Sequence, residues 1–90
     1  MDLNELRNLI TNNKKDGVIM SNGTVDAHDA IKIWNAAGST YSIYSVNNRV
    51  ILTNMSCDDD DEFPASSFSL ACDSSIEPIL ARLRLLNVML

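Results

Sequence analysis

The sequence predicts an α+β fold: a small single domain in which three helices surround a mainly antiparallel sheet of three or four strands. Two observations predict this architecture. Residues 27–37 place apolar side chains at helical spacing. Residues 40–54 contain two β-rich runs separated by two asparagines, which is typical of a hairpin. A chain of 90 residues can bury a core of its own, so we expect residues 1–90 to form one domain built on this central helix and hairpin.

The first element in chain order is a helix over residues 2–13. Asp2 and Glu5 have the spacing of a capping box, with Asp in the Ser/Thr position. Residues 17–20 form a short apolar run that predicts an additional strand, and residues 21–24 have the composition of a turn.

The central helix is predicted from Ala27 to Ala37. Asp26 suits the N-cap, and Gly38 suits the left-handed position after the last residue. Trp34 belongs to the apolar stripe and is interpreted as a core residue, with an exposed binding anchor as the alternative. The stripe consists of Ala27, Ala30, Ile31, Trp34 and Ala37.

The hairpin is predicted to turn at Asn47-Asn48, because asparagine tolerates the positive φ that a two-residue turn requires. This turn sets the strand register. It places Val46 opposite Arg49, Ser45 opposite Val50, Tyr44 opposite Ile51, and Ile43 opposite Leu52. Since side chains alternate along a strand, the predicted core face carries Tyr41, Ile43, Val50 and Leu52.

The last two elements are a strand and a helix. Residues 66–72 alternate, with Phe68, Leu70 and Cys72 on one side, and are predicted to pair with an edge of the hairpin. A helix is then predicted to follow a cap at Ser74 or Ser75 and to continue to Leu90, with Pro78 in its first turn. Leu85, Val88 and Met89 fall outside its apolar stripe, so we expect this end to be deeply buried or to form an oligomer interface, as in a homodimer.

The net charge of −5 comes from one segment. Asp58, Asp59, Asp60, Asp61 and Glu62 are adjacent, and the remaining 85 residues have seven acids and seven bases. We interpret an exposed loop at about residues 56–65 as a docking element for a protein partner with a basic surface. A solvated loop that aids solubility is the alternative. The Lys and Arg residues are scattered, which predicts no direct binding of nucleic acid.

Residues suited to catalysis or metal binding are few. Cys57 and Cys72 flank the acidic segment and are expected to be thiols in a cytoplasmic protein, although a disulfide between them would add about 3 kcal/mol. Zinc would need two further ligands, and the spacing of a calcium loop is absent. His28 could act as a base only with a cysteine nucleophile, for which no signature exists. We therefore expect no enzyme activity, cofactor or metal.

No apolar run approaches the length of a membrane span, and no secretory signal begins the sequence. In general build the chain is similar to the small inhibitors that phages and mobile elements carry, including anti-CRISPR proteins. The predicted function is therefore a small acidic protein-interaction module, an anti-defence inhibitor in the host cytoplasm if a phage encodes it. The alternative is a structural or assembly subunit that oligomerises through its C-terminal helix.

Overall fold

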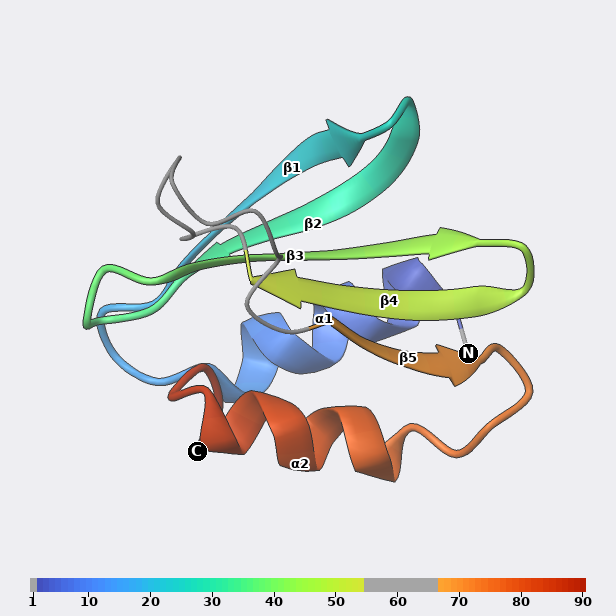
Figure 1. The fold of residues 1–90 in the computed structure, drawn as a ribbon. Helices are drawn as coiled ribbons and strands as arrows, with labels where there is room; N and C mark the ends of the chain where they lie inside the picture. The colour runs from blue at the N-terminus through green and yellow to red at the C-terminus, as the bar shows by residue number, and fades with distance from the viewer. Residues whose placement is uncertain (1, 55–66) are drawn as a thin grey trace.

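The computed structural model describes residues 2–54 and 67–90. This part of the chain forms a five-stranded antiparallel sheet with two helices on one of its faces (Figure 1). The strands lie side by side in sequence order. The elements are α1 (Leu3–Asn13), β1 (Ile19–Val25), β2 (His28–Trp34), β3 (Thr40–Val46), β4 (Arg49–Asn54), β5 (Ser67–Ala71) and α2 (Glu77–Leu85). The α+β class is confirmed, but the described residues have two helices rather than three and five strands rather than three or four.

The first helix begins and ends close to its predicted bounds. Asp2 is the N-cap, and its side chain accepts a hydrogen bond from the Asn4 backbone N–H at 3.2 Å. Leu6 and Ile10 are fully buried on the face that packs against the sheet. The amphipathic spacing therefore located both the helix and its buried side.

The largest correction concerns residues 27–37, which do not form a helix. Asp26 and Ala27 have φ values of 49° and 66°, and they make a two-residue turn that leads from β1 directly into β2. Antiparallel partners on both sides, β1 and β3, satisfy the backbone of β2. Alternation along β2 then buries Ile31 and Ile33 completely. A helix would have removed Ile33 from the apolar stripe, so tertiary burial favours the strand.

Residues 21–24 are also corrected, from a turn to the second half of β1. Ser21 lies opposite Lys32, and Gly23 lies opposite Ala30 in the β1–β2 ladder. Polar and small residues occupy this stretch because β1 is an edge strand and much of it faces solvent. The composition of a turn is therefore compatible here with extended structure.

The β3–β4 hairpin forms as predicted. Asn47 and Asn48 have φ values of 52° and 60°, and each predicted cross-strand pair is present. The residues of the predicted core face, Tyr41, Ile43, Val50 and Leu52, are all buried. The strand after the acidic segment is β5, which pairs with β4 so that Leu52 lies opposite Phe68.

The second helix starts later and stops earlier than predicted. Ser75 Oγ accepts from the Glu77 N–H at 3.2 Å, although Ile76 occupies the N-cap position. At the other end Asn87 has a φ of 62°, and Val88 N–H donates to the Leu83 carbonyl at 2.9 Å. These contacts form a Schellman motif, which ends the helix.

The residues after this motif return to the core. Met89 makes an isolated bridge with Lys14, and Leu90 N–H donates to the Asn13 carbonyl at 3.2 Å. Val88 and Met89 are consequently buried within their own chain. Only Leu85, of the three residues predicted at an oligomer interface, keeps an exposed side chain.

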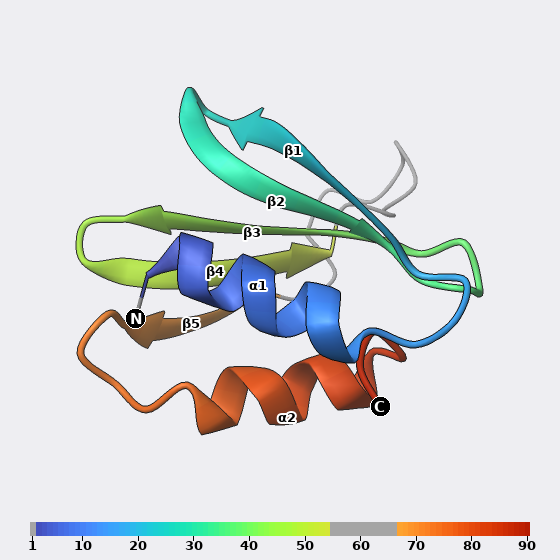
Figure 2. The same ribbon diagram turned by 180° about the vertical axis from the view of Figure 1, so that it is seen from behind.

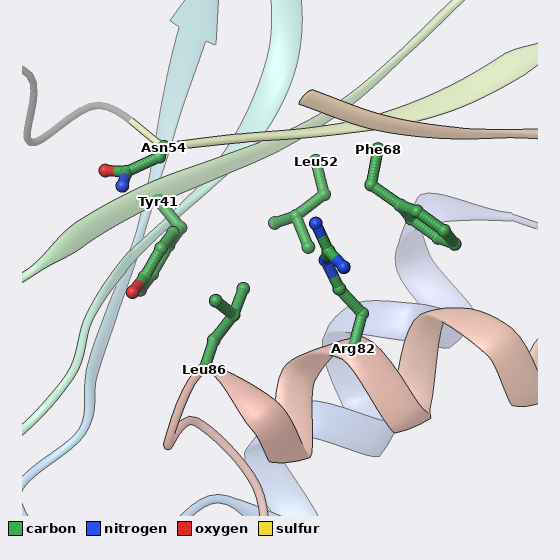
Figure 3. A pocket seen from close by; sticks show the side chains of 6 residues that line it. All are labelled: Tyr41, Leu52, Asn54, Phe68, Arg82 and Leu86. Atoms are coloured by element: carbon green, nitrogen blue, oxygen red, sulfur yellow. The ribbon is translucent and has the colours of Figure 1, made fainter. Parts of the chain in front are cut away.

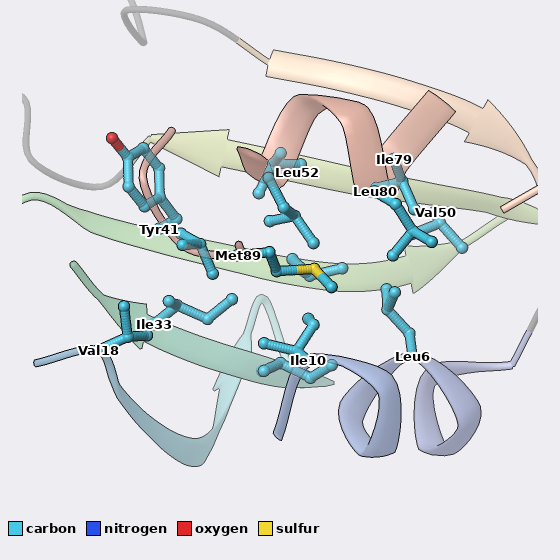
Figure 4. Packing of buried hydrophobic residues seen from close by; sticks show 14 residues of the cluster. Leu6, Ile10, Val18, Ile33, Tyr41, Val50, Leu52, Ile79, Leu80 and Met89 are labelled. Atoms are coloured by element: carbon cyan, nitrogen blue, oxygen red, sulfur yellow. The ribbon is translucent and has the colours of Figure 1, made fainter. Parts of the chain in front are cut away.

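The core lies between the sheet and the two helices, which cover the same face when the molecule is seen from either side (Figure 2). Apolar side chains from α1, from the strands β2, β3 and β4, and from α2 meet there (Figure 4). Phe68 and Leu70 of β5 are partly buried and pack against this cluster. The fully buried members of this cluster are Leu6, Ile10, Ile31, Ile33, Ile43, Val50, Ile79, Leu83 and Val88. This arrangement leaves the opposite face of the sheet without a helix over it.

Candidate interaction surface

The open face is the side of the sheet that neither helix covers. Side chains alternate along each strand, and the strand registers fix which residues lie on this side. Ala30 of β2 and Ser42 of β3 are buried among their neighbours, while Tyr44 of β3 and Ile51 of β4 lie opposite each other and are half-buried. The face is therefore packed in the middle of the sheet and accessible toward its edges.

A directly opposed pair, Ile19 on β1 and Trp34 on β2, forms the most exposed apolar part of this face. Ile19 is 63% exposed and Trp34 is 36% exposed, whereas the neighbouring Ile33 on the helix-covered side is fully buried. The predicted core role of Trp34 is therefore wrong. Because β2 is a strand, residues 33 and 34 point to opposite sides, and Trp34 lies on the open face.

The cations of the open face are held by hydroxyl groups on adjacent strands. Lys32 lies across Gly23, where an added Cβ would come within 2.9 Å of its side chain, and its Nζ donates to Ser42 Oγ at 3.1 Å. Arg49 donates to Ser69 Oγ at 3.0 Å through Nη2. No Asp or Glu occupies an open-face position of the described strands. The described part of this face is thus apolar and basic, although the chain is acidic.

A separate hollow lies between the sheet and α2, beside Tyr41 and Leu86 (Figure 3). Its volume is only about 10 Å³, which is about the space of one water molecule. Arg82 closes one side, with its guanidinium carbon 5.3 Å from the centre of the Phe68 ring, a cation–π contact. This hollow is a packing feature at the rim of the core and is too small for an organic ligand.

The residues that sequence reasoning singled out are not brought together. Asp58, Asp59, Asp60, Asp61, Glu62 and Cys57 lie outside the described residues. His28 is exposed at the start of β2, and Cys72 follows β5, three strands away across the sheet. The Cys72 sulfur instead lies 3.7 Å from Ser45 Oγ. His28 and Cys72 therefore do not form a nucleophile and base pair.

The structure does describe the residues on either side of the acidic segment. Asn54 ends β4 and Ser67 begins β5, on neighbouring strands, and Thr53 lies directly opposite Ser67. This end of the sheet is also where Trp34 ends β2 and Ile19 begins β1. The exposed apolar pair and the attachment points of the acidic segment consequently share one end of the sheet.

Within residues 2–54 and 67–90, no three His, Cys, Asp or Glu side chains are grouped so that they could hold a metal ion. Neither described helix has the length and apolar character needed to span a bilayer. Comparison of the chain with protein-family models, with curated proteins and with solved structures finds no match.

Sequence reasoning missed the Ile19–Trp34 pair because it assigned the two residues to different kinds of element. The signal that could have found it is the run Ile31-Lys32-Ile33, in which β-branched residues alternate with a polar one. Once this run is assigned to a strand, Trp34 falls on the side away from the two isoleucines. Its cross-strand partner then follows from the turn at Asp26-Ala27.

Proposed function

We propose that this protein is a non-catalytic protein-interaction module whose open sheet face binds its partner around Ile19 and Trp34. The observation that carries this proposal is the exposure of this opposed pair on a face that no helix covers. Trp side chains are common at the energetic centres of protein interfaces, since they bury a large apolar area and carry a donor. A partner would remove both side chains from water at one step.

The acidic segment Asp58–Glu62 supports a more specific form of the proposal, in which the partner also has a basic surface. Five adjacent carboxylates attract clustered Lys and Arg side chains and accelerate association at low salt. The flanks of this segment lie at the Ile19–Trp34 end of the sheet. In this proposal an apolar contact provides affinity and the carboxylates steer the encounter, as an inhibitor of the phage or mobile-element type would require.

The test is affinity capture from the source cell with four forms of the chain. The wild type and Leu85→Ser are expected to retain the same partner, because Leu85 is 76% exposed on α2 and lies outside the proposed contact. Trp34→Ser is expected to lose it. A variant with Asp58, Asp59, Asp60 and Asp61 changed to Asn is expected to bind more slowly, with a weaker dependence on salt.

Equal retention of the partner by Trp34→Ser and wild type would refute the role of the open face. Equal association rates for the Asn variant at low salt would refute the role of the carboxylates. Trp34 is the only tryptophan, so the purified partner can also be titrated against the wild type by intrinsic fluorescence. A blue shift on binding is expected if Trp34 leaves water.

A second candidate function is the assembly subunit predicted from the last helix. One observation favours it: Leu85 is 76% exposed and Leu90 is 80% exposed at the C-terminal end. Val88 and Met89, two of the three residues predicted at this contact, are buried within their own chain. Leu85→Ser is expected to convert an oligomer to a monomer in light scattering if this surface mediates assembly.

A further inference from the structure

The strand β1 is an edge of the sheet: β2 pairs with one of its sides, and no described strand lies beyond the other. It has seven residues, Ile-Met-Ser-Asn-Gly-Thr-Val, without a charge or a proline. Natural proteins commonly protect an edge of this length with lysine, proline or a bulge, because an open edge can pair with another strand. The absence of these devices indicates that β1 is available for pairing.

The turn at Asp26-Ala27 determines which backbone groups face the open side. A two-residue turn makes Val25 and His28 a hydrogen-bonded pair. Hydrogen-bonded and non-bonded pairs alternate in an antiparallel ladder, so the odd-numbered residues of β1 are bonded to β2. The N–H and C=O groups of Met20, Asn22 and Thr24 therefore point toward the free edge.

We propose that β1 pairs antiparallel with β1 of a second copy of this chain, about a two-fold axis that passes between the two Asn22 residues. The three outward-facing residues are symmetric about Asn22. Asn22 then lies opposite the partner subunit's Asn22, and Met20 lies opposite the partner subunit's Thr24. Each of these pairs can exchange two N–H···O=C bonds, and the sheet continues through both copies.

This register also places compatible side chains opposite each other across the two copies. On the open face, Ile19 lies opposite the partner subunit's Val25, so that two apolar side chains lie side by side, and the outer surface of the open face stays accessible. The paired strands bring no carboxylates together, because β1 has none. The net charge of the chain therefore does not oppose pairing at the strand itself.

The helix-covered side of the edge has room for a side chain of an added strand. A groove of about 200 Å³ runs beside β1, lined by Arg7 and Thr11 of α1 and by Met20, Ser21 and Asn22. The guanidinium of Arg7 makes one side-chain hydrogen bond, from Nη1 to Asn4 Oδ1 at 2.6 Å. The partner subunit's Asn22 side chain projects toward this groove, where its amide oxygen can accept from Arg7.

A second copy fits better than an unrelated extended peptide. Both the free backbone groups and the apolar residues at the two strand ends are arranged symmetrically about Asn22, as an isologous contact requires. An unrelated strand would gain the backbone bonds from this arrangement but not the match of Ile19 with Val25.

The experiment is light scattering after size exclusion, from micromolar to millimolar concentration, on the wild type and on Asn22→Lys. The wild type is expected to approach the mass of a dimer as concentration rises. Asn22→Lys places two like charges opposite each other at the axis, and it is expected to raise the dissociation constant by about tenfold or more. Ala81→Lys adds the same charge at an exposed position of α2 and is expected to dimerise as the wild type does.

A mixture of Asn22→Lys and Asn22→Glu chains tests the register directly. The two opposite charges meet at the axis only in this pairing, so native mass spectrometry is expected to show mixed dimers in excess of both homodimers. A wild type that stays monomeric throughout, an Asn22→Lys chain that dimerises normally, or a mixture without preference for mixed dimers would each overturn the proposal. Thermal melting of each variant verifies that the chains compared are folded.

Discussion

The turn between β1 and β2 can be tested through the stability of Ala27→Gly. A left-handed turn at this position predicts that the substitution stabilises the fold, whereas a helix predicts that it destabilises the fold. Ala27 has a φ of 66°, in the left-handed region. For an L-residue with a Cβ this conformation costs about 1–2 kcal/mol, whereas for glycine it costs almost nothing. Glycine loses about 0.5–1 kcal/mol more through the freedom of the unfolded chain. Ala27→Gly is therefore expected to stabilise the fold by about 0.5–1 kcal/mol, since the steric relief is the larger effect.

A helix over residues 27–37 requires the opposite result, because glycine inside a helix costs about 1 kcal/mol relative to alanine. The expected gain corresponds to a rise in Tm of about 2–8 °C for a domain of this size. Urea unfolding followed by Trp34 fluorescence measures it, as a higher midpoint with an unchanged slope.

Ala37→Gly is the matched control. Ala37 is exposed, and its φ is not positive, so the same substitution relieves no strain there. It is expected to lower the stability by about 0.5–1 kcal/mol through unfolded-chain entropy alone. If Ala27→Gly lowers the stability as Ala37→Gly does, the assignment of a left-handed turn at this position is wrong.

Two further predictions concern the core and its polar anchor. Ile43→Ala is expected to destabilise the fold by about 2–5 kcal/mol, because Ile43 is fully buried in the middle strand; chemical unfolding measures the loss, and a cost below 1 kcal/mol would contradict this packing. Asn35→Ala is expected to cost about 1–3 kcal/mol, since the buried amide donates to the Leu86 carbonyl at 3.0 Å and accepts from the Ala37 and Ser39 N–H groups. Amide hydrogen exchange after Asn35→Ala is expected to be fastest at the β2–β3 turn and the end of α2, and uniform exchange would contradict this local role.

The elements that the sequence predicted well depend on local chemistry. Asn47-Asn48 supplies positive φ at two successive positions, and alternation on either side then fixes the register and the buried face of β3 and β4. Asp2 likewise marks the start of α1, because its side chain caps the helix two residues away. In both cases the determining contacts lie within a few residues of each other.

The end of α2 was predictable in principle. Asn87 adopts the left-handed conformation that asparagine tolerates, and the apolar Val88 follows it, which is the pattern of a Schellman motif. Extending the apolar stripe of the helix to Leu90 ignored this signal. Of the two outcomes expected for this end, deep burial applies to Val88 and Met89, which pack into the core of their own chain.

One part of the candidate site could be predicted from the sequence, and the other part could not. The acidic segment is evident from composition alone, as five neighbouring carboxylates in an otherwise balanced chain. The Ile19–Trp34 pair depends on β1 and β2 being neighbours, and the open edge depends on β1 being outermost. Both are properties of the assembled sheet.

In residues 27–37 the local sequence pattern is not sufficient to assign the structure. Their apolar residues satisfy a helical period as well as an alternating one, and intrinsic preferences differ by less than about 1 kcal/mol per residue. The sequence by itself determined the amphipathic first helix, the asparagine hairpin and the acidic segment. Only the tertiary structure decided that these residues extend between β1 and β3, because pairing on both sides satisfies the backbone and buries Ile31 together with Ile33.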